Sequence, residues 1–84
     1  MIPNYHVLIV KHVGATNENA AQVKIISERF KCSVKIPYTN DPGASTPSLD
    51  TAIIWLNKRG YKIIGKGEGK DHYYLITDTF ESLK

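Results

Sequence analysis

Residues 31–38 show the cleanest two-residue alternation in the chain, and this pattern constrains the fold more than any other part of the sequence. Successive side chains of a strand point to opposite faces of its sheet, so such a segment has one face in a core and the other in water. The apolar side chains are Cys32, Val34, Ile36 and Tyr38, and those between them are Lys31, Ser33, Lys35 and Pro37. The pattern predicts a sheet with one buried face and one wet, basic face.

Four other segments have the composition of strands. Residues 5–13 and 22–30 precede the alternating segment, and residues 61–64 and 72–79 lie in the C-terminal third. The centre of the first segment is apolar on both faces, which is typical of a central strand. Pro37 cannot donate a backbone hydrogen bond to a neighbouring strand, so it belongs at a strand end or on a sheet edge.

One segment has the periodicity of a helix. The residues that recur at helical spacing are Leu49, Ala52, Ile53 and Leu56. Thr46 or Ser48 can cap its start, with Pro47 at the first helical position. Gly60, which follows two cations, is a standard end. The chain is therefore predicted to form one α+β domain over residues 1–84, in the order β-β-β-α-β-β, with an antiparallel sheet and one amphipathic helix packed on one face.

Size and composition narrow the classes of function. The core of an 84-residue chain leaves little room for an enclosed substrate cavity, which typically needs about 300 Å³ or more, so we expect a non-enzymatic protein without a cofactor. A single cysteine, Cys32, can form no internal disulfide and indicates a reducing compartment. The apolar run at residues 7–10 is too short for a signal peptide or a membrane span. We therefore expect a cytoplasmic protein that does not engage a membrane.

The stretch GKGEGK at residues 65–70 alternates glycine with charge, which suits either a phosphate cradle or a hairpin. A phosphate-binding loop of the Walker or dinucleotide type places its glycines before the N-terminus of a helix, because the helix amides hold the phosphates. Here β-rich residues follow, and the predicted helix comes before. The stretch is interpreted as a hairpin in which glycine supplies positive φ or a bulge.

Histidine and cysteine residues do not form a pattern typical of a metal or catalytic site. His6 and His12 share a strand face, but six residues of extended chain separate them by about 20 Å, too far for one ion. His72 lacks an HxH or HExxH partner. Cys32 falls on the apolar side of its strand, where burial opposes ionisation of the thiol. We therefore predict no catalytic residue and no metal ligand.

Basic and aromatic residues carry the remaining signal. The net charge of +3 permits a polyanionic partner. Cations contact phosphates and aromatic rings stack on bases, so a basic sheet face with tyrosines is typical of nucleic-acid binding. The same lysines also suit a solvated face that guards strand edges against aggregation. The candidate nucleic-acid-binding residues are Lys24, Lys31, Lys35, Lys62, Lys66, Lys70, Tyr73 and Tyr74.

Ile54 and Trp55 fall on opposite sides of the apolar stripe of the predicted helix. In one interpretation the helix has a broad buried face, with Trp55 at the edge of the core. In the other, these residues anchor a partner protein, since exposed aromatic side chains carry a large share of interface energy.

Several phrases of the sequence resemble a family of small bacterial accessory proteins of about this length, found in genomes and in mobile elements such as phages and plasmids. The phrases are VGATN, QVKIISERFKCSVKIPY, LDTAIIWL, GYKIIGKGEG and HYYLITDTF. The resemblance covers residues 5–80 and includes no catalytic motif, so it transfers no activity and no site residue. It implies an accessory role in a prokaryotic cell, linked to phage or plasmid biology.

Two functions follow from these patterns. The leading hypothesis is a non-enzymatic binding module that contacts nucleic acid through a basic sheet face and the glycine-rich hairpin. The alternative is a protein-interaction module or inhibitor, for example of a host defence or regulatory protein, that uses Ile54 and Trp55 or a sheet edge. The sequence is compatible with a homodimer in either case.

Overall fold

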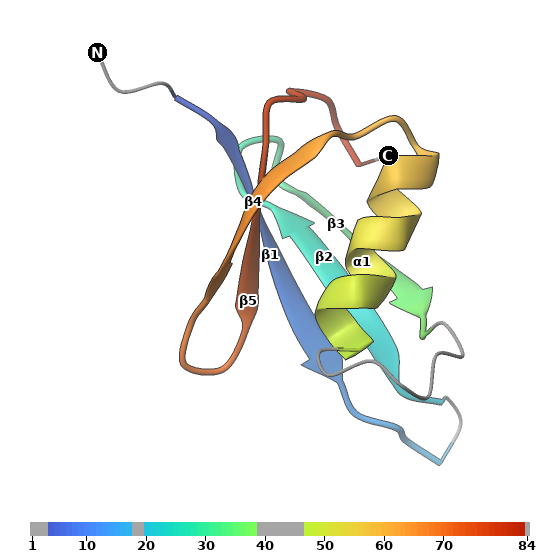
Figure 1. Ribbon diagram of the computed structural model, residues 1–84. Helices are drawn as coiled ribbons and strands as arrows, with labels where there is room; N and C mark the ends of the chain where they lie inside the picture. Colours follow the sequence, from blue (N-terminus) through green and yellow to red (C-terminus); the bar gives the residue numbers. More distant parts are fainter. Residues whose placement is uncertain (1–3, 18–19, 39–46, 84) are drawn as a thin grey trace.

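The segments with a two-residue period form one antiparallel sheet, and the helical segment lies across one face of it (Figure 1). The structure, a computed structural model, describes residues 4–17, 20–38 and 47–83. Its elements are β1 (His6–Val13), β2 (Gln22–Ser27), β3 (Cys32–Pro37), α1 (Pro47–Lys58), β4 (Ile63–Glu68) and β5 (Tyr73–Thr77). The predicted α+β fold and its β-β-β-α-β-β order are confirmed.

The strands are arranged in the order β3-β2-β1-β5-β4, and every neighbouring pair is antiparallel. β1 is the central strand, as its apolar centre predicted. β3 and β4 are the two edges, and Pro37 ends the edge strand β3, where its missing amide proton removes no bond of the ladder. In chain order α1 lies between these two edge strands, so the chain crosses the sheet on the helix-covered side (Figure 1).

The boundary of β2 differs from the prediction. β2 ends at Ser27, because residues 28–31 turn the chain into β3. Lys31 closes this turn in the left-handed region, with φ of 51°. Its amide donates to the carbonyl oxygen of Glu28 at 3.3 Å. The predicted strand 22–30 therefore contains a strand followed by a turn.

The glycine-rich stretch lies in the β4–β5 hairpin, as predicted, but most of it is strand. β4 runs through Gly65 and Gly67 to Glu68, with a bulge between Ile63 and Gly65. Of the two roles expected for these glycines, positive φ is wrong, because Gly60 alone among the described glycines has it. The irregularity at Gly65 agrees with the other role, a bulge. The hairpin turns at residues 69–72, where the amide of Gly69 donates to the carbonyl oxygen of His72 at 2.8 Å.

The helix begins and ends at the residues that the sequence indicated. α1 starts at Pro47, so Ser48, the alternative cap, lies inside the helix. Thr46, the other predicted cap, lies outside the described residues. At the other end Gly60 has φ of 90°, which glycine adopts without strain. The amide of Tyr61 donates to the carbonyl oxygen of Leu56 at 3.0 Å, which is the hydrogen bond of a Schellman motif that spans more residues. This motif directs the chain back toward the sheet to form β4.

The hydrophobic core fills the space between the sheet and α1. α1 lies against β1, β2 and β4, and inward-facing residues of β3 and β5 together with Leu83 of the C-terminal segment complete the same cluster. The buried apolar residues are Leu8, Val10, Val23, Ile25, Ile36, Leu49, Ala52, Leu56, Tyr61, Leu75 and Leu83. The core thus takes up one face of the sheet.

The C-terminal segment is fastened at the C-terminal end of α1. Arg59 donates from Nη2 to the carbonyl oxygen of the buried Leu83 at 3.0 Å. The hydroxyl of Tyr61 donates to the carbonyl oxygens of Glu81 and Ser82 at 2.7 and 3.0 Å. Burial raises the pKa of Tyr61 above its ordinary value of 10.0, and the carboxylate of Glu81 adds to this shift while Arg59 opposes it.

We expect Tyr61 to ionise in the folded protein at a higher pH than it does in the unfolded chain, as a late step of tyrosine ionisation. The folded protein keeps the Tyr61 proton at a pH where the unfolded chain releases it, so the free energy of unfolding should fall above a pH of about 10. Tyrosinate absorbance measures the ionisation, and urea unfolding at several pH values measures the stability. Tyr61→Phe should remove the late step, and a late step that survives in this variant would contradict the assignment.

Candidate nucleic-acid interface

The face of the sheet opposite α1 is covered by no described element and is here called the open face (Figure 1). Its residues alternate along each strand with the residues of the core. β1, β2, β3 and β5 contribute the side chains. They are Val7, Ile9, Lys11, Val13, Gln22, Lys24, Ile26, Ser33, Lys35, Pro37, Tyr74 and Ile76.

Three lysines stand in one row across the open face. Lys11 of β1 pairs with Lys24 of β2, and Lys24 pairs with Lys35 of β3. Directly opposed like charges destabilise a sheet. No Asp or Glu occupies a strand position on the described part of the open face to offset them. This lysine row therefore concentrates positive charge at a site where the fold alone disfavours it.

A second row lies two residues further along the strands, next to the lysine row, and it is mainly apolar. Ile9 pairs with Ile26 on one side and with Tyr74 on the other. Val7, beyond this row, is 45% exposed, and it pairs with Ile76. The open face therefore combines cations with partly exposed apolar side chains.

A shallow hollow of about 340 Å³ lies at the apolar end of the open face. Val7, Ile9 and Tyr74 contribute to its lining, and Glu28 and Arg29 from the β2–β3 turn contribute as well. The guanidinium of Arg29 is stacked on the ring of Phe80 at 4.8 Å. The hollow thus joins apolar side chains to one acid and one cation.

The ring of Tyr74 is held in place from two sides. Its hydroxyl shares a hydrogen bond of 2.7 Å with Nε2 of His72, and the two rings meet edge to face with centroids 5.0 Å apart. In the β4–β5 turn, a Cβ atom added to Gly69 would lie 3.0 Å from Cε2 of Tyr74. The absence of a side chain at this glycine therefore leaves the space that the ring occupies.

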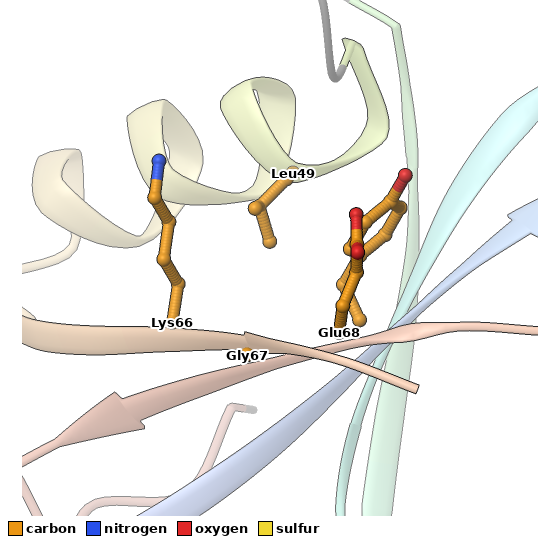
Figure 2. Close-up of a pocket in the computed structure, with 5 residues that line it drawn as sticks. Leu49, Lys66, Gly67 and Glu68 are labelled. Carbon is orange, nitrogen blue, oxygen red and sulfur yellow. The ribbon is translucent and has the colours of Figure 1, made fainter. Parts of the chain in front are cut away.

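The structure divides the predicted nucleic-acid-binding residues between different parts of the molecule. Lys24, Lys35 and Tyr74 lie together on the open face. Tyr73 packs against the core on the helix side, and Lys66 pairs with the buried Leu75 and points toward α1 (Figure 2).

The other three predicted lysines lie outside the strands. Lys31 is in the β2–β3 turn, Lys70 is in the β4–β5 turn, and Lys62 precedes β4. All three are exposed. Lys11, which belongs to the lysine row, was not among the predicted residues, although it has the same position in the strand alternation as Ile9.

A second cavity, of about 210 Å³, lies between the start of α1 and β4 (Figure 2). Leu49 extends into it from the helix, while Lys66 and Glu68 extend from the strand. Tyr73 also lines it. This cavity carries one cation and one anion, so it has no excess charge of either sign.

Ile54 and Trp55 occupy a third part of the surface, between α1 and β3. Ile54 is 40% exposed, whereas Trp55 is half-buried, packs against the core and carries the guanidinium of Arg59 at 4.7 Å from its ring. A hollow of about 190 Å³ lies beside them and is also lined by Ile36 and Pro37. Ile54 is therefore the more accessible of the two predicted anchors.

His6 and His12 hydrogen-bond to different residues in separate parts of the structure. His6 is buried, and its two ring nitrogens contact the hydroxyl of Ser27 at 2.7 Å and the carbonyl oxygen of Thr79 at 3.0 Å. His12 contacts the hydroxyl of Tyr38. Within residues 4–17, 20–38 and 47–83, no group of three or more histidine, cysteine or acidic residues is placed to hold a metal ion.

Comparison of the chain with protein-family models, curated proteins and solved structures finds no match. In the part of the chain that the structure describes, no helix has the length and apolar character needed to cross a bilayer.

Proposed function

We propose that this protein is a non-enzymatic binding module that contacts nucleic acid through the open face. The lysine row carries this proposal. Lys11, Lys24 and Lys35 are directly opposed on three adjacent strands. The phosphates of a polyanion bound across them would attract all three ammonium groups and so offset their mutual repulsion.

The spacing of the row suits a phosphate backbone. Neighbouring strands lie about 4.8 Å apart, so the Cα atoms of the three lysines span about 10 Å across the sheet. Flexible lysine side chains can spread their ammonium groups further, and each ammonium group contacts phosphate as a point charge. A backbone running across the strands would therefore meet several cations in sequence.

The test is a triple variant in which Lys11, Lys24 and Lys35 are all replaced with glutamine. The parent protein should bind a labelled oligonucleotide at low salt, with a plot of log affinity against log salt that has a slope of about −2 for three contacts with a single strand. The variant should lose most of this binding and most of the salt dependence, as measured by fluorescence anisotropy.

The matched control replaces Lys58, Lys62 and Lys66 with glutamine, which removes the same charge away from the lysine row. This control should bind nearly as the parent does. Equal loss in the two triple variants would contradict a role for the row, because it would assign the attraction to net charge alone. An absence of binding by the parent at low salt would contradict the proposed function itself.

The resemblance to small accessory proteins supports a place for this module in the bacterial cytoplasm, in a process linked to phage or plasmid biology. Accessory proteins that contact nucleic acid need no catalytic site of their own. The cations and the aromatic ring of the open face are binding groups of this kind.

A second candidate function, a protein-interaction module, is favoured by the surface between α1 and β3. Ile54 is 40% exposed beside the hollow that Trp55 lines. An apolar side chain from a partner would bury both residues there, and aromatic anchors of this kind dominate many interfaces. This surface and the lysine row lie on different sides of the sheet, so the lysine variants separate the two functions.

A further inference from the structure

We propose that the ligand of the open face is a single strand of nucleic acid that crosses the β-strands, with its phosphates along the lysine row and a base against Tyr74. This inference rests on the proposed function and specifies which form of nucleic acid the face accepts. It follows from the apolar residues beside the lysines, which a purely phosphate-directed surface does not require.

The apolar row points to a ligand with exposed base faces. Ile9, Ile26 and Tyr74 are only partly buried, and they stand next to the three lysines. A duplex presents mainly phosphates and sugars to a flat surface, so these side chains would gain little from it. A single strand presents unstacked bases, whose faces are apolar and pack on aromatic and aliphatic side chains.

The two rows have the separation that a nucleotide requires. Residues two apart on one strand lie about 6.6 Å apart, so the apolar row lies about that far from the lysine row. Both rows run across the strands, because each is made of directly paired residues. A nucleic-acid strand whose backbone follows the lysines therefore places bases over Ile26 and Ile9, and its next base, one β-strand beyond Lys11, over Tyr74.

The ring of Tyr74 is already ordered in the unbound protein. The hydrogen bond between its hydroxyl group and Nε2 of His72 orients the ring, and Gly69 leaves room for it. A ring that is already ordered loses little conformational freedom on binding. The hollow of about 340 Å³ beside it offers room for a base on the side toward Val7.

The experiment compares three labelled probes at about 50 mM salt: oligothymidylate, a duplex of the same length, and heparin. The parent should bind oligothymidylate more tightly than the duplex. Tyr74→Ala should weaken oligothymidylate binding by about 5- to 100-fold, the usual effect of removing one stacking ring, and leave heparin binding unchanged. Oligouridylate, as a fourth probe, shows whether RNA and DNA strands are both accepted.

Two further variants separate stacking from loss of structure. Tyr74→Phe keeps the ring and should bind oligothymidylate nearly as the parent does. Tyr74→Leu keeps apolar bulk without an aromatic face and should weaken binding as Tyr74→Ala does. Thermal unfolding of each variant establishes the fraction that is folded at the temperature of the binding measurement.

Several outcomes would overturn the inference. A preference for the duplex, or parent-like binding of oligothymidylate by folded Tyr74→Ala and Tyr74→Leu, would contradict a single-stranded ligand. The result for the lysine row would still test the proposed function separately. Binding of none of the four probes by the parent would remove both. A dimer in sedimentation experiments that Tyr74→Ala dissociates would assign the open face to a second copy of the chain instead.

Discussion

Replacing His6 with alanine should lower the free energy of unfolding by about 3–5 kcal/mol, the largest effect of any single substitution considered for this fold. The side chain is 1% exposed. Its removal leaves a cavity, and it also leaves the hydroxyl of Ser27 and the carbonyl oxygen of Thr79 without the partner that each has at 2.7 and 3.0 Å. The cavity and the unpaired polar groups both destabilise the folded state, so their effects add.

The aromatic rings around His6 add to the expected loss. Its ring meets Phe30 edge to face at 5.3 Å and stacks on Phe80 at 5.7 Å. These contacts join the β2–β3 turn and the C-terminal segment to β1. Domains of this kind have a total stability of about 5–15 kcal/mol, so the variant should approach the limit of folding.

Urea unfolding followed by the fluorescence of Trp55, the single tryptophan, measures this effect. Val7→Ala is a suitable control, since Val7 is the next residue of β1 and is 45% exposed. The control should cost less than about 1 kcal/mol. A His6→Ala protein as stable as this control would show that the ring is not a buried member of the fold.

The sequence was sufficient for the elements of the fold because their patterns are local. The alternation at residues 31–38 and the helical spacing from Leu49 to Leu56 each describe one element by itself. Strand order depends instead on pairs of residues far apart in the chain. The pairing of Val7 with Ile76, for example, joins β1 to β5 across most of the chain, and no local pattern specifies it.

The candidate site was only partly predictable, because assignment to a face depends on parity. Tyr73 and Tyr74 are adjacent in a strand, so one of them had to face the core, and the sequence left both as candidates. Residues 7–10, just before Lys11, are all apolar, so the sequence does not indicate which of them face the core. The face on which Lys11 lies is therefore not specified either. In β4 the bulge at Ile63/Gly65 shifts the register, and a shift of one residue moves a side chain such as Lys66 to the other face.

Replacing Lys24 with glutamate should change stability and nucleic-acid affinity in opposite directions. Lys24 is the middle residue of the lysine row, paired with Lys11 on one side and Lys35 on the other. A carboxylate there would convert two like-charge pairs into two opposite-charge pairs, each worth roughly 0.2–1 kcal/mol. The free energy of unfolding should therefore rise.

Affinity for an oligonucleotide should fall at the same time, on the order of 100-fold at low salt, because one charge-assisted contact is lost and the new carboxylate repels the phosphates. The slope of log affinity against log salt should become shallower for the same reason. Lys24→Gln, which removes the cation without adding an anion, should lie between the parent and Lys24→Glu in both measurements.

Lys66→Glu provides the matched control, since it makes the same change of charge on the helix side of the sheet (Figure 2). It should affect affinity much less than Lys24→Glu does. If Lys24→Glu lost stability and affinity together, the affinity loss would reflect unfolding. A gain in stability with a loss of affinity would show that the lysine row destabilises the sheet but is needed for ligand binding. A row of alternating charges would stabilise the sheet more.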